Sequence, residues 1–336
     1  MFRIARLVVG DDMKRDQVAM RICIFGRDDD AISRHTEQVA LARGHDVLRV
    51  AFSSMQSGAA VAFDGSSWLF QGEDLAACDG YVLRQYPAAH ALLAPPDEQL
   101  NGAEWYRRAM QQVERSTFAQ SAIMQAELSG KPMVNPLLAM SPYEHKPLQL
   151  ATFHRAHLPI PRTVITNFPD AVRIFMADVA QLGSAVISKP VAGGAETILV
   201  DDDVCARLDS IKPAPVIFQE RALGPDVRVT VVHQRVVSAV VVHSEDGVDY
   251  RRGDAYRSGD ARYTPHTLPH DVEEMSVRAA GLCHHVLSGI DWKLTKDGYV
   301  LLEANSAPVY LDIEHKTGAP ITQAVVEYLE SAARAH

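Results

Sequence analysis

The fold is decided by Gly289-Ile-Asp-Trp-Lys-Leu-Thr-Lys-Asp-Gly-Tyr-Val-Leu-Leu-Glu-Ala-Asn305, which has the pattern of a β-hairpin. Apolar residues dominate both halves, and Lys296-Asp297-Gly298 between them is typical of a tight turn. If the turn is centred on Asp297, each strand residue faces the residue equally far beyond the turn. Asp291 and Glu303 each lie six residues from Asp297. The hairpin therefore predicts that these two carboxylates face each other, roughly 5 Å apart at Cβ.

The facing carboxylates indicate a metal site. Like charges directly opposite each other destabilise a sheet unless a cation lies between them. Asn305 lies two residues beyond Glu303, and therefore on the same face of its strand. Hard oxygen ligands of this kind suit Mg²⁺, which keeps several waters and shares substrate phosphates. The alternative is an exposed hairpin with incidental acids, but apolar neighbours such as Trp292 and Leu301 favour an interior hairpin.

Candidate groups for binding phosphates lie upstream of the hairpin. Lys189 ends the apolar strand Ala185-Val-Ile-Ser-Lys189, so its charge is expected to point into a cleft. Gly193 and Gly194 follow in a loop whose backbone N–H groups could cover phosphates, with a plain turn as the other interpretation. Lys146 opens a predicted helix, where the helix dipole disfavours a cation. An anion beside Lys146 would explain it, and we therefore predict that both lysines bind a polyphosphate.

A nucleotide base could bind between the lysines and the hairpin. Gln219-Glu220-Arg221-Ala222 ends a predicted strand just before a Gly-Pro turn. Main-chain groups at such a strand end could bind the edge of an adenine, and a polar strand end without a ligand is the equal alternative. The sequence has no Walker motif, and no GxGxxG follows the first strand. The nucleotide hypothesis therefore depends on the order of lysines, glycine loop, strand end and hairpin.

The pattern of the rest of the chain predicts an α/β protein. Residues 20–137 begin with a strand–helix–strand unit typical of a small domain with a parallel sheet. Residues 1–19 are expected to be a flexible arm or a spurious upstream start. The predicted strands are 20–26, 45–50, 80–84, 133–136, 162–166, 185–189, 198–200, 215–220, 227–232, 236–243, 289–295 and 299–304. The predicted helices are 34–43, 103–128, 142–157, 170–182, 271–287 and 321–333.

Composition excludes several classes of protein. The chain has 336 residues, 47% hydrophobic and 22% charged, which is ordinary for a globular protein. No run approaches the roughly 18 apolar residues of a membrane helix, and the net charge of −9 without a basic stripe argues against nucleic acid. Four cysteines more than 50 residues apart fit a reducing cytoplasm. Cys283-His284-His285 could hold a metal, but polar positions on a helix are the favoured interpretation.

Short segments along the chain carry a resemblance to a known family. They are Val134-Asn-Pro136, His145-Lys-Pro-Leu-Gln-Leu-Ala151, Leu158-Pro-Ile-Pro-Arg-Thr-Val-Ile-Thr-Asn167, Ser188-Lys-Pro190, Gln219-Glu220, Asp226-Val-Arg-Val-Thr-Val231, Asp249-Tyr-Arg251, Gly289-Ile-Asp291, Leu302-Glu-Ala-Asn305 and Ile313-Glu-His-Lys-Thr-Gly318. In order and spacing they resemble the ATP-grasp superfamily over about residues 20–330. The pattern is most similar to the RimK-like carboxylate–amine ligases, and among these to the maturases of microviridin-type peptides (graspetides).

The resemblance implies an ATP-grasp fold, an α/β (α+β) fold of three lobes. These would be a Rossmann-like pre-ATP-grasp domain in residues 20–137, a small central α/β lobe in 138–218, and a C-terminal antiparallel-sheet lobe in 219–336. ATP would bind between the central and C-terminal lobes. Many relatives are homodimers or homotetramers, so we expect an oligomer, with neither a membrane nor a nucleic acid as a partner.

The resemblance also implies roles for individual residues. Lys146 and Lys189 would contact the ATP phosphates under a mobile loop with Gly193 and Gly194. The adenine and the nucleotide framework would lie near Gln219, Glu220, Ala222 and Asp226. Two Mg²⁺ ions, or Mn²⁺ in their place, would be held by Asp291, Glu303 and Asn305. Arg251 would face the acyl phosphate or the acceptor, and Arg251 or Arg228 would stabilise the tetrahedral oxyanion.

Two departures from the family pattern concern the substrate. Ribosomal-protein glutamate ligases typically read Asn-Ala-Ser-Pro-Gly after the metal glutamate, and peptide maturases Asn-Pro-x-Gly-Gln, whereas this chain reads Asn305-Ser-Ala-Pro308-Val. Maturases often carry paired arginines where this chain has Arg84-Gln85. Arg84, Arg252 and Arg257 are predicted to bind the substrate, because arginine pairs bidentately with carboxylates. A solvated basic loop is the alternative for the last two.

The predicted activity is an ADP-forming ligation. A carboxylate, from a free acid, an amino acid or a peptide, would be activated as an acyl phosphate and then joined to an amine. One alternative is a maturase that installs intramolecular amide or ester links in a ribosomal peptide. A non-catalytic nucleotide-binding regulator is a lesser alternative, and a kinase that stops at phosphoryl transfer is weaker still. The complete set of hairpin ligands and lysines argues against the regulator.

Overall fold

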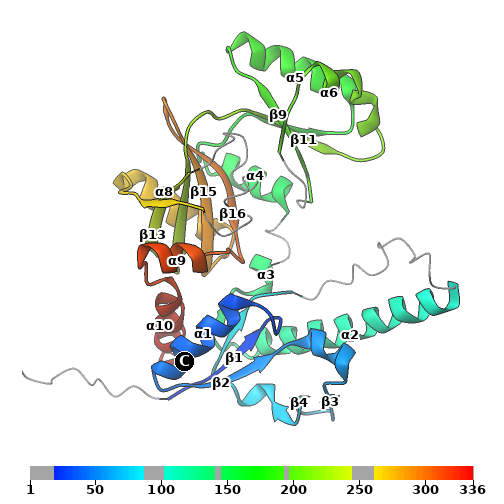
Figure 1. The fold of residues 1–336 in the computed structure, drawn as a ribbon, viewed down its shortest axis with the longest axis vertical. Helices are drawn as coiled ribbons and strands as arrows, with labels where there is room; N and C mark the ends of the chain where they lie inside the picture. The colour runs from blue at the N-terminus through cyan, green and yellow to red at the C-terminus, as the bar shows by residue number, and fades with distance from the viewer. Residues whose placement is uncertain (1–18, 87–101, 141–144, 193–196, 244–260, 336) are drawn as a thin grey trace, which may run out of the picture.

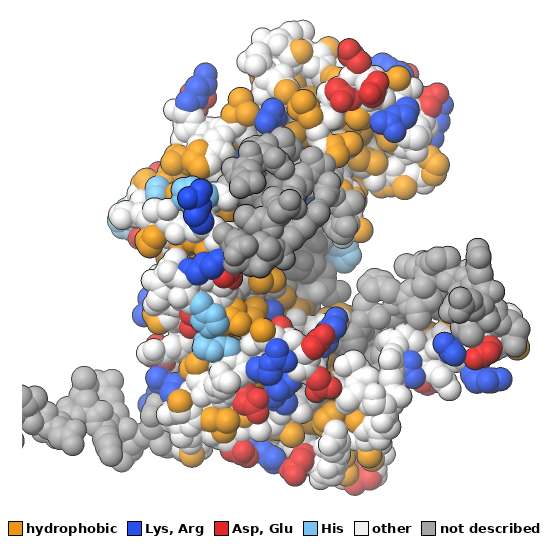
Figure 2. All heavy atoms as spheres, viewed as in Figure 1, with side chains coloured by type: hydrophobic (Ala, Val, Ile, Leu, Met, Phe, Trp, Pro, Cys, Tyr) orange, Lys and Arg blue, Asp and Glu red, His pale blue; other side chains and the backbone are white. Residues whose placement is uncertain are grey.

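The computed structural model describes residues 19–86, 102–140, 145–192, 197–243 and 261–335. Within these ranges no helix is long and apolar enough to cross a membrane. The described strands form four sheets, and a small sheet over residues 61–74 is inserted in the chain between two strands of the first sheet (Figure 1). Figure 2 shows acidic and basic side chains interspersed over the face in view, without a large patch of one sign.

The N-terminal part is built on a parallel sheet with strand order β2-β1-β6-β7. Strand β1 is an apolar run whose last four residues are buried, as expected for a parallel strand covered on both faces. Helix α2 packs on one face, and a small antiparallel sheet of β3, β4 and β5 adjoins it. The bounds are β1 Arg21–Phe25, α1 Ala31–Ala42, β2 Asp46–Val50, η1 Phe52–Ser57, β3 Val61–Phe63, β4 Trp68–Phe70, β5 Glu73–Asp74, η2 Leu75–Ala77, β6 Gly80–Leu83, α2 Gly102–Leu128, β7 Met133–Val134 and α3 Leu137–Met140.

The central part is a separate antiparallel sheet with strand order β10-β9-β11-β8. Its own small core lies under α5 and includes Val172, Val179 and Phe218. In Figure 1 this sheet and its helices lie at the top of the molecule. The bounds are β8 Thr163–Thr166, α5 Pro169–Gln181, β9 Val186–Pro190, β10 Ile198–Leu199, α6 Asp202–Ala206, η5 Leu208–Ile211 and β11 Val216–Glu220.

The C-terminal part is an antiparallel sheet with strand order β14-β13-β12-β15-β16. Helix α8 covers one face, where Ile290 and Trp292 of β15 are fully buried and the Trp292 indole donates to Ser276 Oγ at 3.1 Å. Asp291 therefore points from the opposite face. The bounds are α4 Lys146–Arg155, β12 Asp226–Val232, β13 Arg235–Val242, β14 Tyr263–Pro265, α8 His270–Leu282, β15 Leu287–Thr295, β16 Gly298–Asn305, α9 Leu311–Thr317 and α10 Ile321–Ala333.

The last helix, α10, packs against both the N-terminal sheet and the C-terminal sheet. One core cluster contains Ile22 and Ile24 of β1, Val240 and Val242 of β13, and the inner face of α10. In Figure 1, α10 lies beside α1 and below β13. Glu330 of α10 accepts a two-pronged contact from Arg43, at 2.8 and 2.9 Å. The N-terminal and C-terminal sheets thus share one core, whereas the central sheet has its own.

The predicted elements agree with the observed ones to within about three residues, except at two helix ends and in the short elements. The predicted helix over 142–157 is wrong at its N-terminus, because His145 is the extended N-cap and α4 begins at Lys146; residues 142–144 lie outside the described residues. The predicted helix over 271–287 is wrong at its C-terminus, because α8 ends at Leu282. The backbone N–H of Cys283 closes the helix on Ala279 and Ala280, and His284 adopts a φ of 57°, which turns the chain out of the helix. His285 consequently lies in the link between α8 and β15, and Leu287 begins β15. The 3-10 turns, α9 and the β3-β4-β5 sheet had no prediction.

Candidate active site

The hairpin β15–β16 pairs Asp291 directly with Glu303, which confirms the predicted register at this position. The turn itself differs from the prediction. Thr295 pairs with Gly298, so only Lys296 and Asp297 form the turn, and its centre lies half a residue before Asp297.

A β-bulge restores the predicted pairing. Trp292 pairs with Leu301 and Asp291 pairs with Glu303, which leaves Leu302 opposite no residue of β15. A regular ladder continuing from the two-residue turn would instead place Asp291 opposite Leu302. The bulge therefore brings the two carboxylates together, a known use of bulges beside functional sites.

The two carboxylates lie within a row of alternating charges. Arg228 of β12 pairs in register with Asp291, and its Nε lies 2.8 Å from Asp291 Oδ1. On the other side, Lys146 Nζ lies 3.3 Å from Glu303 Oε2. The four side chains are only 12–19% exposed. Because the site is largely shielded from water, the repulsion between the two facing carboxylates is stronger than in solvent. The flanking cations of the row Arg228–Asp291–Glu303–Lys146 offset this repulsion.

Asn305 completes the predicted set of oxygen-bearing side chains. Its side-chain nitrogen donates to Asp291 Oδ2 at 3.1 Å and to the Gly289 carbonyl at 3.2 Å. Two carboxylates and one amide fit Mg²⁺, because this ion takes few protein ligands and completes its shell with water and phosphate oxygens. Within the described ranges, no group of three or more His, Cys, Asp and Glu residues is placed to hold a metal. A metal at the hairpin would therefore use Asn305 in addition to the two acids.

Gly289 makes room for Arg228. A Cβ atom at position 289 would collide with Arg228 Nη1, and it would approach Pro308 Cβ to 2.8 Å. Gly289 faces Asn305 across the hairpin and shares the Asp291 face. The guanidinium reaches Asp291 by lying over this bare stretch of backbone.

Two buried amides that had no predicted role hold the hairpin in place. Gln149 of α4 donates to the Ala304 carbonyl at 2.7 Å and accepts from the Ala304 N–H at 2.9 Å, which docks α4 on β16. Lys146 lies one helical turn before Gln149, and this docking aims it at Glu303. Spacing gave no signal for this role, because the partner is main chain 155 residues away.

Asn135, the residue after β7, is the second buried amide. Its oxygen accepts from the N–H groups of Val286 and Leu287, at 2.6 and 2.8 Å. Its nitrogen donates to the carbonyls of Leu287 and Ser306. The N-terminal sheet is thereby hydrogen-bonded to both chain ends of the hairpin, just beyond Asn305.

The predicted nucleotide-binding residues fall into two groups. Lys189 donates to Gln219 Oε1 at 3.0 Å, and Gln219 donates in turn to Thr163 Oγ1 at 2.8 Å, all within the central sheet. Gln219 is fully buried, so it orients Lys189. Glu220 ends β11, and Ala222 is half-buried in the link to β12.

Asp226 begins β12 and forms a second ion pair beside the charge row. Its Oδ2 lies 2.9 Å from Lys293 Nζ, and both side chains are nearly buried. Lys293 also donates to the Gly224 carbonyl at 3.2 Å. Asp226 was predicted to lie near the nucleotide framework. In the structure its ion pair with Lys293 fixes the start of β12.

The remaining predicted residues are placed as follows. Arg84 lies 3.4 Å from Asp30, the N-cap of α1, and is 9% exposed. His285 is buried with Nδ1 2.8 Å from Ser288 Oγ, and burial lowers the pKa of its imidazole to about 3. Gly193, Gly194, Arg251, Arg252 and Arg257 lie outside the described residues.

Comparison with known proteins decides the family. The family model described as a RimK-like ATP-grasp domain matches residues 144–329, more than half of the chain. The chain belongs to the RimK-like ATP-grasp family. This match includes the charge row, both lysines and the hairpin.

The relatives of this RimK-like protein are ligases. A probable alpha-L-glutamate ligase of Teredinibacter turnerae is 28% identical over 229 residues, covering 65% of this chain and 74% of that protein. One of Vibrio vulnificus is 23% identical over 325 residues, covering 94% and 97%. This RimK-like protein is accordingly a ligase of ATP-grasp fold, as the sequence predicted.

Solved structures are also similar to this RimK-like protein over nearly the whole chain. The ATP-grasp ligase PsnB, complexed with a phosphomimetic variant of minimal precursor, Mg and ADP, has a TM-score of 0.79 at 29% identity. The match covers 93% of this chain and 98% of PsnB. The macrocyclase MdnC from Microcystis aeruginosa, bound with precursor peptide MdnA, has a TM-score of 0.75 at 19% identity, covering 92% and 99%; this likeness concerns the fold alone.

Proposed function

We propose that this enzyme joins a carboxylate to an amine with ATP and Mg²⁺, through an acyl phosphate, and releases ADP and phosphate. The observation that carries the proposal is the row Arg228–Asp291–Glu303–Lys146, with Asn305 beside it. Facing acids with flanking cations in a nearly buried site match the need to hold metal and polyphosphate together. The PsnB complex, which contains Mg and ADP, supports both cofactors.

In the first step, a substrate carboxylate oxygen attacks the γ-phosphorus of ATP. The bond from that phosphorus to the bridging oxygen breaks, which yields the acyl phosphate and ADP. Asp291, Glu303 and Asn305 would hold Mg²⁺, which supplies charge neutralisation on the transferring phosphoryl group. Lys146 and Lys189 would bind phosphate oxygens, and Lys146 would exchange its contact with Glu303 for one with phosphate.

In the second step, the amine nitrogen attacks the acyl carbonyl. The carbon–oxygen bond to phosphate breaks, phosphate leaves with the electron pair, and the nitrogen loses a proton. Arg228 would stabilise the oxyanion from its place beside Asp291, and Arg251 would share this role. A hydroxyl in place of the amine would give an ester by the same steps.

A peptide is the substrate that the comparisons favour. PsnB was solved with minimal precursor and with precursor peptide PsnA2, and it matches nearly the whole chain. We therefore propose, as the more specific function, that the enzyme links an acidic side chain of a precursor peptide to an amine or hydroxyl of the same peptide. A free amino acid as the carboxylate or amine is the alternative, supported by the glutamate ligase relatives.

The division into lobes also remains a proposal, with boundaries at residues 20–137, 138–218 and 219–336 and an extension over 1–19. The separate sheets support it. Two observations bear on the boundaries. Helix α4 packs Phe153 into the C-terminal core, and the boundary after residue 218 falls within β11.

The test is ADP release with Mg-ATP against amino acids, dipeptides and Asp/Glu-rich peptides. Glu303→Gln removes the charge of one facing acid and is expected to lower the rate by about 100-fold or more. Asp297→Asn, an exposed acid in the turn of the same hairpin, is the matched control and is expected to keep full activity. Stimulation only by peptides supports the maturase, and stimulation by free acids supports the small-molecule ligase. Equal activity in Glu303→Gln and wild type would rule out the proposed site.

A further inference from the structure

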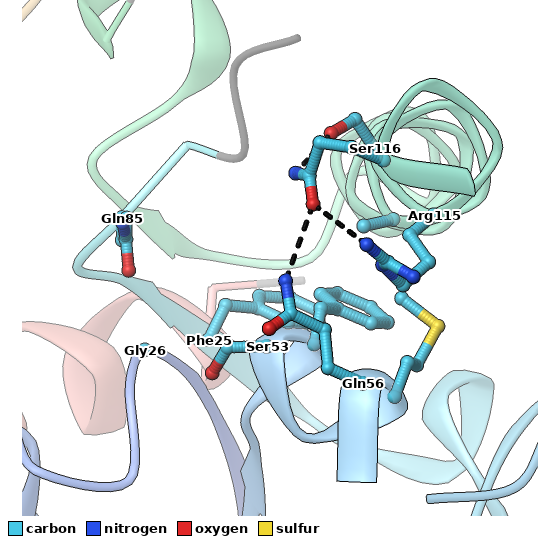
Figure 3. A pocket seen from close by; sticks show the side chains of 11 residues that line it. Phe25, Gly26, Ser53, Gln56, Gln85, Arg115 and Ser116 are labelled. Atoms are coloured by element: carbon cyan, nitrogen blue, oxygen red, sulfur yellow. Dashed lines mark hydrogen bonds between the residues drawn. The ribbon is translucent and has the colours of Figure 1, made fainter. Parts of the chain in front are cut away.

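The N-terminal sheet carries a cavity that the proposed chemistry does not use. It has a volume of about 150 Å³ and lies between the ends of β1 and β6, the 3-10 helix η1 and helix α2. Figure 3 shows Phe25 and Ser53 below it, Arg115 and Ser116 on α2, and Gln85 on the far side.

The position in the sheet is one where ligands bind. The chain runs from β1 to β2 on one side and later to β6 on the other side of β1. Open parallel sheets bind ligands outside the carboxyl ends of their strands, where the order reverses in this way. Phe25 and Gly26 at the end of β1, and Gln85 just past β6, line the cavity at that point.

Arg115 gives the cavity its charge, because no acidic residue lines it. Its Nη2 donates to Gln112 Oε1 at 3.1 Å, and Gln112 donates to Ser116 Oγ at 3.1 Å. Gln56 also donates to Gln112, at 3.3 Å. The side-chain hydrogen bond that Arg115 forms among the described residues goes to a neutral amide, Gln112, and its buried Nε has no hydrogen-bond partner. The guanidinium is thus held in place with donor capacity left for an anion.

Apolar and aromatic side chains also line the cavity. Phe25 and Phe52 stack with ring centres 5.8 Å apart, and Met55 lies beside them. An arginine fork beside an apolar wall fits a planar carboxylate on a short aliphatic stem. A singly charged carboxylate matches the one cationic side chain among the described residues that line the cavity.

The cavity lies on the sheet edge that faces the hairpin. Strand β7 is two strands from β1, about 10 Å along this edge. The residue after β7, Asn135, is hydrogen-bonded to Leu287 and Ser306 at the ends of the hairpin. A substrate that reaches the hairpin could therefore leave a second carboxylate in the cavity.

We propose that Arg115 and this cavity bind a substrate carboxylate that is not the one phosphorylated by ATP. This carboxylate belongs to an acidic side chain of a peptide or to a free acidic amino acid. Binding here requires neither ATP nor metal, so it can be measured apart from the proposed function. Met55 is a local reporter, since its side chain lines the cavity.

The experiment is an NMR titration of the full chain with ¹³C-methyl methionine, with the Met55 signal assigned through Met55→Leu. The probes are L-glutamate and the blocked peptide acetyl-Ala-Glu-Ala-amide, with L-glutamine and inorganic phosphate as comparison ligands. We expect a saturable shift of the Met55 signal with L-glutamate or the peptide. Arg115→Gln should raise the dissociation constant about 10-fold or more.

Arg107→Gln is the matched control, an exposed arginine two turns earlier on α2, and should bind as wild type does. Unchanged Met133 and Met140 signals in Arg115→Gln verify the fold, and Arg115→Lys is used if that variant does not fold. Tighter binding of the peptide or of L-glutamate identifies the source of the carboxylate. Absence of a Met55 shift, equal binding by Arg115→Gln, or equal binding of L-glutamine or phosphate would overturn the proposal. Glu303→Gln should leave the Met55 shift intact, which separates this result from failure of the ligase proposal.

Discussion

At the scale of single residues, the site depends on the absence of a side chain at Gly289. Its missing side chain lets the Arg228 guanidinium cross the strand to Asp291, and a Cβ would occupy that path. The sequence placed Asp291, Glu303 and Asn305 on one hairpin because period-two alternation and turn composition are local signals. The bulge at Leu302 was not predictable from them. The register was nevertheless right, because the bulge and the shorter turn shift the pairing by equal and opposite amounts.

Gly289→Ala is expected to displace Arg228 and lower the rate of ADP release at least about 10-fold, since the guanidinium loses its charge-assisted contact. The control is Gly281→Ala in α8, where an added Cβ meets nothing within 4 Å. That change should leave activity as it is. Full activity in Gly289→Ala, measured at equal folded fraction, would mean that the position of Arg228 is unimportant.

At the scale of elements, α4 and β16 act as one unit through Gln149. The residue is 3% exposed and satisfies both main-chain groups of Ala304. Gln149 hydrogen-bonds the main chain of β16 as a neighbouring strand would. Such a contact produces no recognisable periodicity or charge pattern in the sequence. The sequence therefore predicted the lysine at the start of α4 without predicting what aims it.

Gln149→Leu keeps the approximate shape but leaves the N–H and C=O of Ala304 buried without partners. We expect a loss of about 2–3 kcal/mol in the free energy of unfolding. A positioning role further predicts that the Mg²⁺ concentration for half-maximal ADP release rises, because Lys146 and Glu303 separate. Gln181→Leu, an exposed glutamine at the end of α5, should change neither quantity. Loss of stability with an unchanged Mg²⁺ requirement would contradict the positioning role and leave Gln149 with a structural role alone.

At the scale of the whole molecule, Glu330 ties the last helix to the N-terminal sheet. Burial acts to raise the pKa of its carboxyl, but contacts with Arg43 and His45 prevail and hold that pKa below the ordinary value of 4.5. A depressed carboxyl pKa stabilises the fold at pH values above 4.5, and the contribution is lost as the pH falls through the folded-state value. Such a tie between distant segments was not predictable from composition or motifs.

Glu330→Gln is expected to lower the free energy of unfolding near pH 7 by about 2–3 kcal/mol, because the Arg43 guanidinium and the buried His45 ring lose their carboxylate partner. The difference from wild type should shrink as the pH falls below 4.5, as followed by chemical denaturation at several pH values. Glu327→Gln, 38% exposed and 3.7 Å from Arg43, should cost less than about 1 kcal/mol. A difference that stays constant with pH would contradict the assigned role of the carboxylate charge.

The shared core under α10 has a consequence for synthesis on the ribosome. Strand β1 emerges well before α10, so the core cluster around Ile22 and Ile24 is completed only when residues 321–333 arrive. At ordinary elongation rates of 5–20 residues per second, the finished β2-β1-β6-β7 sheet would wait roughly 10–40 s with an apolar face exposed. The nascent chain is therefore expected to engage chaperones during that interval, and a truncated product without α10 should aggregate.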